Sequence, residues 1–227
     1  MVAIQYQGSL TPSVEEGDTL RLTALALDID GNPLPEVPVV WQVLALDTTV
    51  VGFTLDTLTG LITAVSPGGP WSVQGRADDL RMSTPVRVTV TGAPDSVAGV
   101  EPTRVTVAAD ADSSPPLIAM VYDLTTVPDT AKGLAAKRVA FQLVDPAPGS
   151  AAAAGVALAA PGDTSTTADP YAVIVLSGPT GQARVIARRI SGFVQPDSIL
   201  VDAFAFTARG DTVTGSPVRF TVLFLAN

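Results

Sequence analysis

The chain has 227 residues, of which 47% are hydrophobic and only 15% charged, so it can bury one large core or two ordinary ones. Its formal net charge of -9 gives no basic field for a phosphate backbone, so nucleic acid is not expected as a partner. Cysteine and histidine are both absent, which excludes disulfides, thiolate or imidazole metal ligands, and Ser-His-Asp or Cys-His catalysis.

The distribution of apolar residues predicts no membrane span. The most apolar candidate, residues 151–160, is interrupted by Gly155 and has about half the length that a bilayer requires. No basic segment followed by an apolar signal opens the chain, because Val2 already begins a strand-like alternation. Two interpretations stay open, a cytoplasmic protein or a start trimmed before Met1, and we favour the second.

Short strands separated by turn residues are predicted through residues 1–92. Residues 19–27 alternate in hydropathy, and residues 28–33 (Asp-Ile-Asp-Gly-Asn-Pro) form a turn, because Asp-Gly tolerates positive φ and the proline cannot continue a ladder. Residues 37–46 return as a strand carrying Trp41, whose ring suits the space between two sheets. With no helical period anywhere, this part is predicted to be an all-β sandwich.

Two matching segments close two halves of the chain. Residues 84–90 (Thr-Pro-Val-Arg-Val-Thr-Val) and 216–222 (Ser-Pro-Val-Arg-Phe-Thr-Val) alternate apolar and polar positions behind a proline. Each is expected to be a final strand with one buried face. The chain is therefore predicted to hold two copies of one kind of β domain, residues 1–92 and 93–227, joined by a short linker. The positions expected to face inward are Val86, Val88, Val90, Val218, Phe220 and Val222.

A series of local motifs in the first half points to a family. The series is Gly17-Asp18-Thr19 before an alternating strand, Asp30-Gly31-Asn32, Val40-Trp41, and Thr-Gly-Leu-Ile-Thr-Ala at residues 59–64. It resembles the bacterial immunoglobulin-like group 2 repeat over nearly all of this half. The sequence departs from that repeat at residues 67–71 (Pro-Gly-Gly-Pro-Trp), where the family has a compact Pro-Gly-Thr-Ala strand start. The resemblance implies an immunoglobulin-like antiparallel sandwich.

The second half carries a similar strand pattern over a longer stretch. Ala119-x-Val121-x-Asp123, Val139-x-Phe141-x-Leu143 and Thr180-Gly181-x-Ala183 resemble, more loosely, the invasin-type group 1 repeat. Residues 145–170 exceed what such a domain needs, and their Ala, Gly, Ser, Thr and Pro content predicts a long flexible surface loop. The alternative is a binding loop, because loops on a rigid sandwich carry recognition. Strands are predicted at residues 104–108, 117–122, 139–144, 171–176, 182–188, 199–206 and 218–225.

The acidic clusters do not predict a metal or catalytic site. Asp28, Asp30 and Asn32 have the oxygen ligands that open a calcium loop, but Pro33 stands in place of the required glycine and Val39 in place of the bidentate glutamate. Neighbouring acidic residues elsewhere occur in any acidic chain, and nothing else marks a sugar cleft. We therefore expect no cofactor, no metal and no catalysis.

Three residues are candidates for contact with a partner. Arg184 and Arg188 are an even number of positions apart and are expected to share one strand face, whereas Arg189 points the other way. The simplest interpretation is a solvated sheet face, and the alternative is an anionic or membrane-proximal docking surface. Trp71 follows a Gly-Pro breaker, so we expect it to be less securely buried than Trp41 and available for contact.

The resemblance implies an exported protein, periplasmic or at the cell surface, because such repeats occur mostly in adhesins, surface-layer modules and envelope complexes. The leading hypothesis is a non-catalytic structural or adhesive module that presents loops and sheet edges to a protein or glycan partner. The alternative is an extrinsic accessory subunit docked on a larger membrane complex, suggested by the few charges and the apolar residues 222–225. In either case, contact is expected mainly on the second half.

Overall fold

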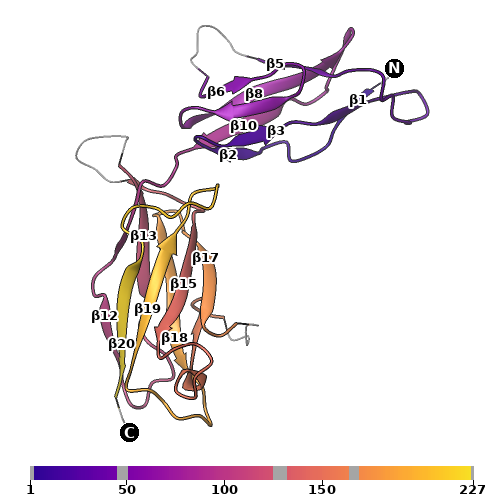
Figure 1. Ribbon diagram of the computed structural model, residues 1–227. Helices are drawn as coiled ribbons and strands as arrows, with labels where there is room; N and C mark the ends of the chain where they lie inside the picture. Colours follow the sequence, from indigo (N-terminus) through magenta and orange to yellow (C-terminus); the bar gives the residue numbers. More distant parts are fainter. Residues whose placement is uncertain (1–2, 45–50, 125–131, 164–168, 226–227) are drawn as a thin grey trace. The chain divides into compact units, whose positions relative to one another are not determined.

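The computed structural model describes residues 3–44, 51–124, 132–163 and 169–225, and divides the chain into two compact units, Met1–Ala93 and Pro94–Asn227 (Figure 1). Within these ranges every regular element is a β-strand except one short 3-10 turn, η1 (Ala153–Gly155). The prediction of an all-β chain is confirmed. No helix in the described part of the chain is long and apolar enough to cross a membrane.

Unit 1 has two layers of strands. The first layer is a sheet of order β2-β10-β8-β5, with β9 paired to β8; its strands are β2 (Ser13–Glu15), β10 (Val86–Thr91), β8 (Gly68–Ala77), β5 (Val40–Val43) and β9 (Leu80–Arg81). The second layer pairs β1 with β4 and has the order β3-β7-β6; its strands are β1 (Ala3–Tyr6), β4 (Ala24–Leu27), β3 (Thr19–Arg21), β7 (Leu61–Ala64) and β6 (Phe53–Leu55). The predicted strand at 37–46 is present as β5, and its positions 45 and 46 lie outside the described residues.

Unit 2 has the same two-layer plan with longer strands. One sheet has the order β11-β13-β18-β16, with β14 paired to β13; its strands are β11 (Ser96–Gly99), β13 (Leu117–Asp123), β18 (Gln182–Arg189), β16 (Val156–Ala159) and β14 (Lys132–Gly133). The other sheet has the order β12-β20-β19-β15-β17; its strands are β12 (Arg104–Val107), β20 (Val218–Phe224), β19 (Ser198–Ala205), β15 (Arg138–Asp145) and β17 (Ala172–Leu176).

Each unit begins with a strand that changes sheets. In unit 1, β1 pairs with β4 in one layer, and β2 then pairs in parallel with β10 in the other. In unit 2, β11 pairs with β13, and β12 then pairs in parallel with β20. A first strand split between two antiparallel sheets, with the last strand beside its second piece, is the immunoglobulin-like order. The prediction of two tandem immunoglobulin-like sandwiches is confirmed.

The closing strands β10 and β20 bury the predicted faces. Val86 and Val88 have no exposed surface, and neither do Phe220 and Val222. In unit 2 the ring of Phe220 lies 6.2 Å from that of Phe141 on β15, and in unit 1 Trp41 is only 2% exposed. Alternation behind a proline was therefore sufficient to locate both cores.

The expected surface loop at 145–170 is wrong for part of its length. Val156–Ala159 forms strand β16, which pairs antiparallel with β18 from Val156 opposite Arg189 to Ala159 opposite Ile186. Ala153, Val156 and Leu158 are at most 2% exposed and belong to the core cluster of unit 2. The apolar methyls and the ladder stabilise this segment despite its linker-like composition. Residues 164–168 lie outside the described residues.

We expect Phe220→Ala to lower the free energy of unfolding of unit 2 by about 3–5 kcal/mol, because it removes a ring from a fully packed core. Phe193→Ala is the matched control, since Phe193 is 56% exposed, and it should cost less than about 1 kcal/mol. Urea unfolding followed by far-UV circular dichroism measures both. Equal costs would show that the two sheets do not pack over Phe220.

We expect Leu158→Ala to destabilise the protein by about 2–4 kcal/mol, because Leu158 is 2% exposed and lies on β16 inside the core. Leu124→Ala, at a position 54% exposed in the same unit, should change stability by less than about 1 kcal/mol. Thermal and urea unfolding of the two variants decide whether 153–159 is core or surface. If Leu158→Ala leaves the stability unchanged, residues 153–159 are a surface loop, as the sequence predicted.

Candidate partner-binding surface

Strand β18 holds both arginines that the sequence singled out. Ala183, Val185 and Ala187 alternate inward with no exposed surface, so Arg184 and Arg188 share the outer face, as predicted. Arg184 is exposed, and its Nη2 donates to Oε1 of Gln182 on the same face. Arg188 is half-buried, and its Nη1 donates to the backbone oxygen of Asp163 at 3.2 Å. Arg184 is therefore the more accessible of the two.

Arg189 turns the other way and holds the end of the sandwich together. Its Nη2 donates to the backbone oxygens of Leu225 at 2.9 Å and Ala108 at 3.3 Å. Its guanidinium carbon also lies 5.1 Å from the centre of the Phe224 ring, a cation–π arrangement. These contacts tie the end of β18 to the chain ends of β12 and β20 in the opposite sheet. The role of Arg189 is therefore structural.

Arg184 borders a shallow cavity of about 380 Å³ where β17 turns into β18. The cavity combines one exposed guanidinium with apolar walls, including Leu176, which is 63% exposed. Such a combination suits a partner that brings a carboxylate or hydroxyl group together with apolar surface, because Arg presents several donors in a planar fork. The lining residues are Ala160, Pro161, Val175, Leu176, Gly178, Pro179, Thr180, Gln182 and Arg184.

Trp71 lies in unit 1, on β8, and is only half-buried. Its ring packs edge-on against Phe53, with centroids 5.6 Å apart and an interplanar angle of 81°. A Cβ added at Gly68 or Gly69 would come within 2.9 Å of the Trp71 ring, so these two glycines make room for it. Part of the ring is thus fixed in the core, and contact with a partner through its exposed part stays a prediction.

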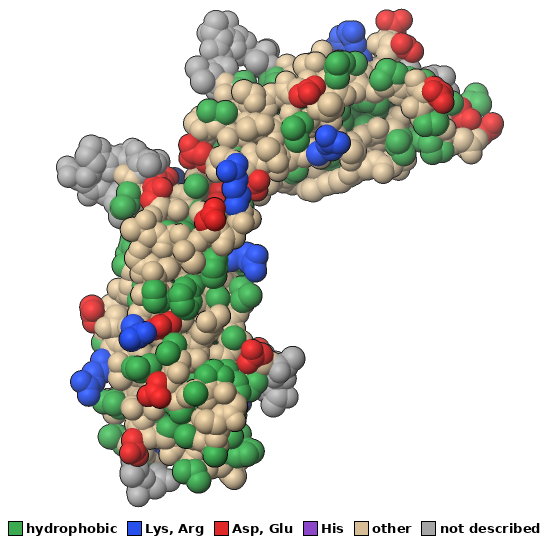
Figure 2. Space-filling view, in the orientation of Figure 1, with side chains coloured by type: hydrophobic (Ala, Val, Ile, Leu, Met, Phe, Trp, Pro, Cys, Tyr) green, Lys and Arg blue, Asp and Glu red, His purple; other side chains and the backbone are tan. Residues whose placement is uncertain are grey.

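The apolar end of the chain belongs mostly to the core. Val222 and Phe224 on β20 are buried, whereas Leu223 is half-buried on the outer face and Leu225 is 52% exposed. The apolar surface that the sequence did not single out lies elsewhere in unit 2: Ile174 is 59% exposed and Val194 81% exposed. Figure 2 shows hydrophobic side chains gathered on the visible face of this unit.

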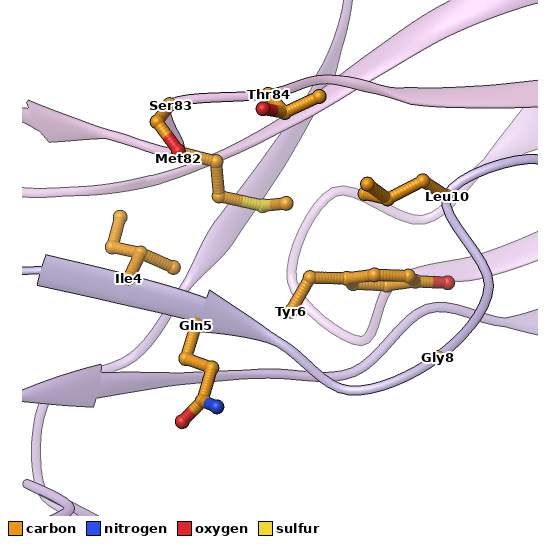
Figure 3. A pocket seen from close by; sticks show the side chains of 8 residues that line it. All are labelled: Ile4, Gln5, Tyr6, Gly8, Leu10, Met82, Ser83 and Thr84. Carbon is orange, nitrogen blue, oxygen red and sulfur yellow. The ribbon is translucent and has the colours of Figure 1, made fainter.

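A second depression, in unit 1, has a volume of about 330 Å³. Figure 3 shows Tyr6, Leu10 and Met82 turned toward one space between β1 and the segment that follows β9, with Gln5 pointing away. Burial raises the pKa of the Tyr6 hydroxyl, so this group stays protonated at neutral pH. The depression therefore offers hydroxyl groups and apolar contact rather than a general base.

The Asp28 loop uses its carboxylate for its own turn. Oδ1 of Asp28 accepts the backbone N–H groups of Asn32 at 2.8 Å and Asp30 at 2.9 Å, and Oδ2 accepts the Asn32 side-chain amide at 3.2 Å. The bonds from Asn32, foremost, hold the pKa of Asp28 below its usual range. Among the described residues, no three Asp or Glu side chains gather in a way that could hold a metal ion.

Comparisons with known proteins give no family and no sequence relative: no family model matches, and no curated protein matches. The group 2 and group 1 memberships therefore stay predictions. Among solved structures, the chain is similar to the adhesin InvE of Yersinia pseudotuberculosis, with 17% identity and a TM-score of 0.42 over 95% of this chain and 56% of that one. It spans about half of that adhesin structure.

Two further solved structures are similar over most of both chains. The fibronectin(III)-like modules of Clostridium thermocellum CbhA are 14% identical, with a TM-score of 0.39 over 98% of this chain and 94% of theirs. The D00-D0 domain of intimin is 14% identical, with a TM-score of 0.33 over 98% of this chain and 99% of that one. The class of this protein, a tandem of immunoglobulin-like sandwiches, rests on its own strand order.

We expect Asp56→Asn to lower the melting temperature at pH 7 and to have a smaller effect at about pH 2. The carboxylate accepts the N–H groups of Thr59 at 3.1 Å and Leu58 at 2.9 Å, which lowers its pKa from the usual value. A lowered folded-state pKa stabilises the protein above the unfolded value of about 3.9, and this stabilisation is lost as the pH falls through the folded value.

Asp79→Asn, at an exposed carboxylate in the turn between β8 and β9, is the matched control and should leave the melting temperature nearly unchanged at both pH values. Differential scanning calorimetry of the three proteins gives the answer. A deficit of equal size at both pH values would mean that the charge of Asp56 has no part in holding its turn.

Proposed function

We propose that this chain is a non-catalytic structural or adhesive module of an exported protein, periplasmic or at the cell surface, which binds a protein or glycan partner mainly through unit 2. The observation that carries the proposal is the surface beside Arg184. There an exposed guanidinium, an apolar-walled cavity of about 380 Å³ and the exposed side chain of Leu176 meet at the edge of a rigid sandwich. A sheet that fixes such groups in place lowers the entropy cost of recognition.

The titratable groups with displaced pKa values support a binding role over a catalytic one. Burial accounts for Tyr6, turn bonds for Asp28 and Asp56, and an ion pair with Asp202 for Arg219. Catalytic sites bring such groups together in one cleft. Here each has a structural explanation of its own, and the chain has no histidine or cysteine to add.

A second candidate function is an extrinsic accessory subunit docked on a larger membrane-bound complex. The segment between β18 and β19 favours it, because Phe193 is 56% exposed and its neighbour Val194 is 81% exposed. Contiguous exposed apolar patches mark contact surfaces, and these two neighbouring side chains would belong to such a patch. Under this candidate the partner would cover Phe193 and Val194 rather than Arg184.

We expect Arg184→Ala to weaken binding of the chain to its cognate envelope fraction or glycan about tenfold, because an anchoring arginine in a partly apolar cavity loses both its hydrogen bonds and its packing. Arg104→Ala is the matched control, since Arg104 is also exposed on unit 2, on β12. Biolayer interferometry against immobilised glycans and envelope proteins measures both.

A paired variant, Phe193→Ser with Val194→Ser, separates the two candidates. If this paired variant loses binding while Arg184→Ala binds fully, the docked accessory subunit is the correct function and the adhesive module is not. Unchanged binding by Arg184→Ala together with loss by Arg104→Ala would place the contact on the other sheet.

A further inference from the structure

Strand β17 is the outermost strand of its five-stranded sheet in the described part of the chain. Its sequence, Ala-Val-Ile-Val-Leu, has no charge and no proline. Sheet edges are normally blocked by lysine, proline, a bulge or a covering segment, because an open row of N–H and C=O groups pairs with another strand. β17 lacks the devices that a side chain can supply, so its edge is chemically suited to pairing.

The hydrogen-bond phase of β17 shows which backbone groups face the open side. Leu143 donates its N–H to the oxygen of Tyr171 at 2.8 Å, and Ser177 donates to the oxygen of Lys137 at 2.9 Å. Because antiparallel partners alternate, the odd-numbered residues of β17 bond to β15, and the even-numbered residues direct N–H and C=O away from it. The outward groups are those of Ala172, Ile174 and Leu176.

The same even-numbered side chains form part of an apolar row on the outer face of the sheet. Ile174 lies opposite Ala140 of β15, and Ala140 lies opposite Phe204 of β19. Ile174 and Leu176 are 59% and 63% exposed. The apolar row therefore runs to the open edge and stops there, with its last member in solvent.

We propose that β17 pairs antiparallel with β17 of a second copy of this chain, with Ile174 on the twofold axis. The pairing must place even-numbered residues opposite even-numbered residues, because these residues direct their N–H and C=O groups to the open side. Directly opposite side chains point to the same face, so the outer faces of the two sheets then become continuous. With Ile174 opposite itself and Ala172 opposite Leu176, all five residues overlap. Every outward N–H and C=O group of both strands then has a partner.

Charge also favours a second copy as the occupant. The chain approaches β17 from Asp169 and leaves it toward Pro179, so antiparallel pairing brings the approach of each copy to the side on which the other copy's strand ends. Pro179 lines the same cavity as Arg184, so an acidic end meets a basic end on both sides of the axis. The strand between them is uncharged, so no like charges oppose each other. An unrelated extended peptide would have to supply this pattern by itself.

The central test is the mass of the purified chain as a function of concentration. Sedimentation equilibrium from ~1 to ~500 µM should show a monomer–dimer equilibrium, with a dissociation constant on the order of 10–100 µM for so short an edge. Ile174→Lys should raise that constant about tenfold or more, because two lysines would face each other on the axis. Ile29→Lys is the matched control, at an isoleucine 84% exposed in unit 1, and should leave it unchanged.

Ile174→Pro protects the test against a folding artefact. The N–H that proline removes points away from β15, so the sandwich keeps its ladder, but the dimer loses its central hydrogen bonds. Circular dichroism and melting temperature should stay near those of the parent chain while the dimer is lost. A monomer at every concentration, or a dimer that both Ile174 variants leave intact, would overturn the proposal.

The register is tested by disulfide trapping, because the chain has no cysteine of its own. Ile174→Cys should oxidise to a covalent dimer, since opposite Cα atoms of about 5.5 Å separation fall within the range that a disulfide spans. Ile29→Cys should form it much more slowly. Ala172→Cys and Leu176→Cys should cross-link when mixed but not alone, because each lies about 13 Å from its own copy.

Cross-linking of Ala172→Cys or Leu176→Cys alone would refute this register. Trapping of a different protein at Ile174→Cys, with the purified chain remaining monomeric, would assign the edge to another partner instead. Apart from the trapping of another protein, these measurements use the purified chain alone, so they succeed or fail independently of the adhesive function proposed above.

Discussion

Both units depend on packing the inward faces of two sheets against each other. In unit 2 the size of the inward side chains decides how closely neighbouring groups in the core approach each other. Phe141 on β15 and Phe220 on β20 flank the central strand β19, where Ala203, opposite Phe141, is fully buried. The small residue lets the two rings approach to 6.2 Å. The facing sheet supplies further alanines, Ala119 and Ala183, which have no exposed surface. Both sheets thus contribute large and small side chains to one buried cluster, as close packing of the interior requires.

The two sheets of unit 2 bury a common core, but each sheet ends in two edge strands, and these edges are protected to different degrees. The β12 side is held by the Arg189 bonds to Ala108 and Leu225. The β11 side is covered in part by the N–H of Val97 donating to Thr214 at 3.0 Å. β17 has neither an arginine nor a crossing segment among the described residues. An unprotected apolar edge carries a risk of aggregation unless a partner covers it. The β17 edge therefore has the physical character of an interface.

The sequence was most informative where one signal fixed both the element and its buried face. Residues 86–90 and 218–222 alternate strictly, so period and burial coincide, and Trp41 needed only a strand to place it in the core. The strand at Val156–Ala159 was missed because a Val-Ala-Leu-Ala segment flanked by alanine, glycine and proline has weak β propensity. It is held by its partner β18 and by burial, which are tertiary effects.

The candidate surface was only partly predictable for a related reason. The even spacing of Arg184 and Arg188 gave their shared face, but their different accessibility depends on tertiary contacts. The backbone oxygen of Asp163 accepts from Arg188, and β16 pairs beside Arg188 but stops before Arg184. Residues 171–176 were correctly expected to form a strand, yet a wholly apolar run does not say whether both faces are covered. That depends on the order of strands in the sheet, which places Ile174 and Leu176 at an edge.

The two surfaces of unit 2 are physically linked, because Leu176 belongs to both the β17 edge and the wall of the Arg184 cavity. Strand pairing at β17 would bring the approach to the other copy's strand, including Asp169, to the mouth of that cavity. An acidic partner and a second copy would then compete for Arg184, so that the paired state blocks ligand binding at this site. A neutral partner that uses mainly the apolar walls would compete less, since it does not need the guanidinium. If both proposals hold, the balance between self-association and recognition would depend on the charge of one arginine and on the hydrogen bonds along one strand.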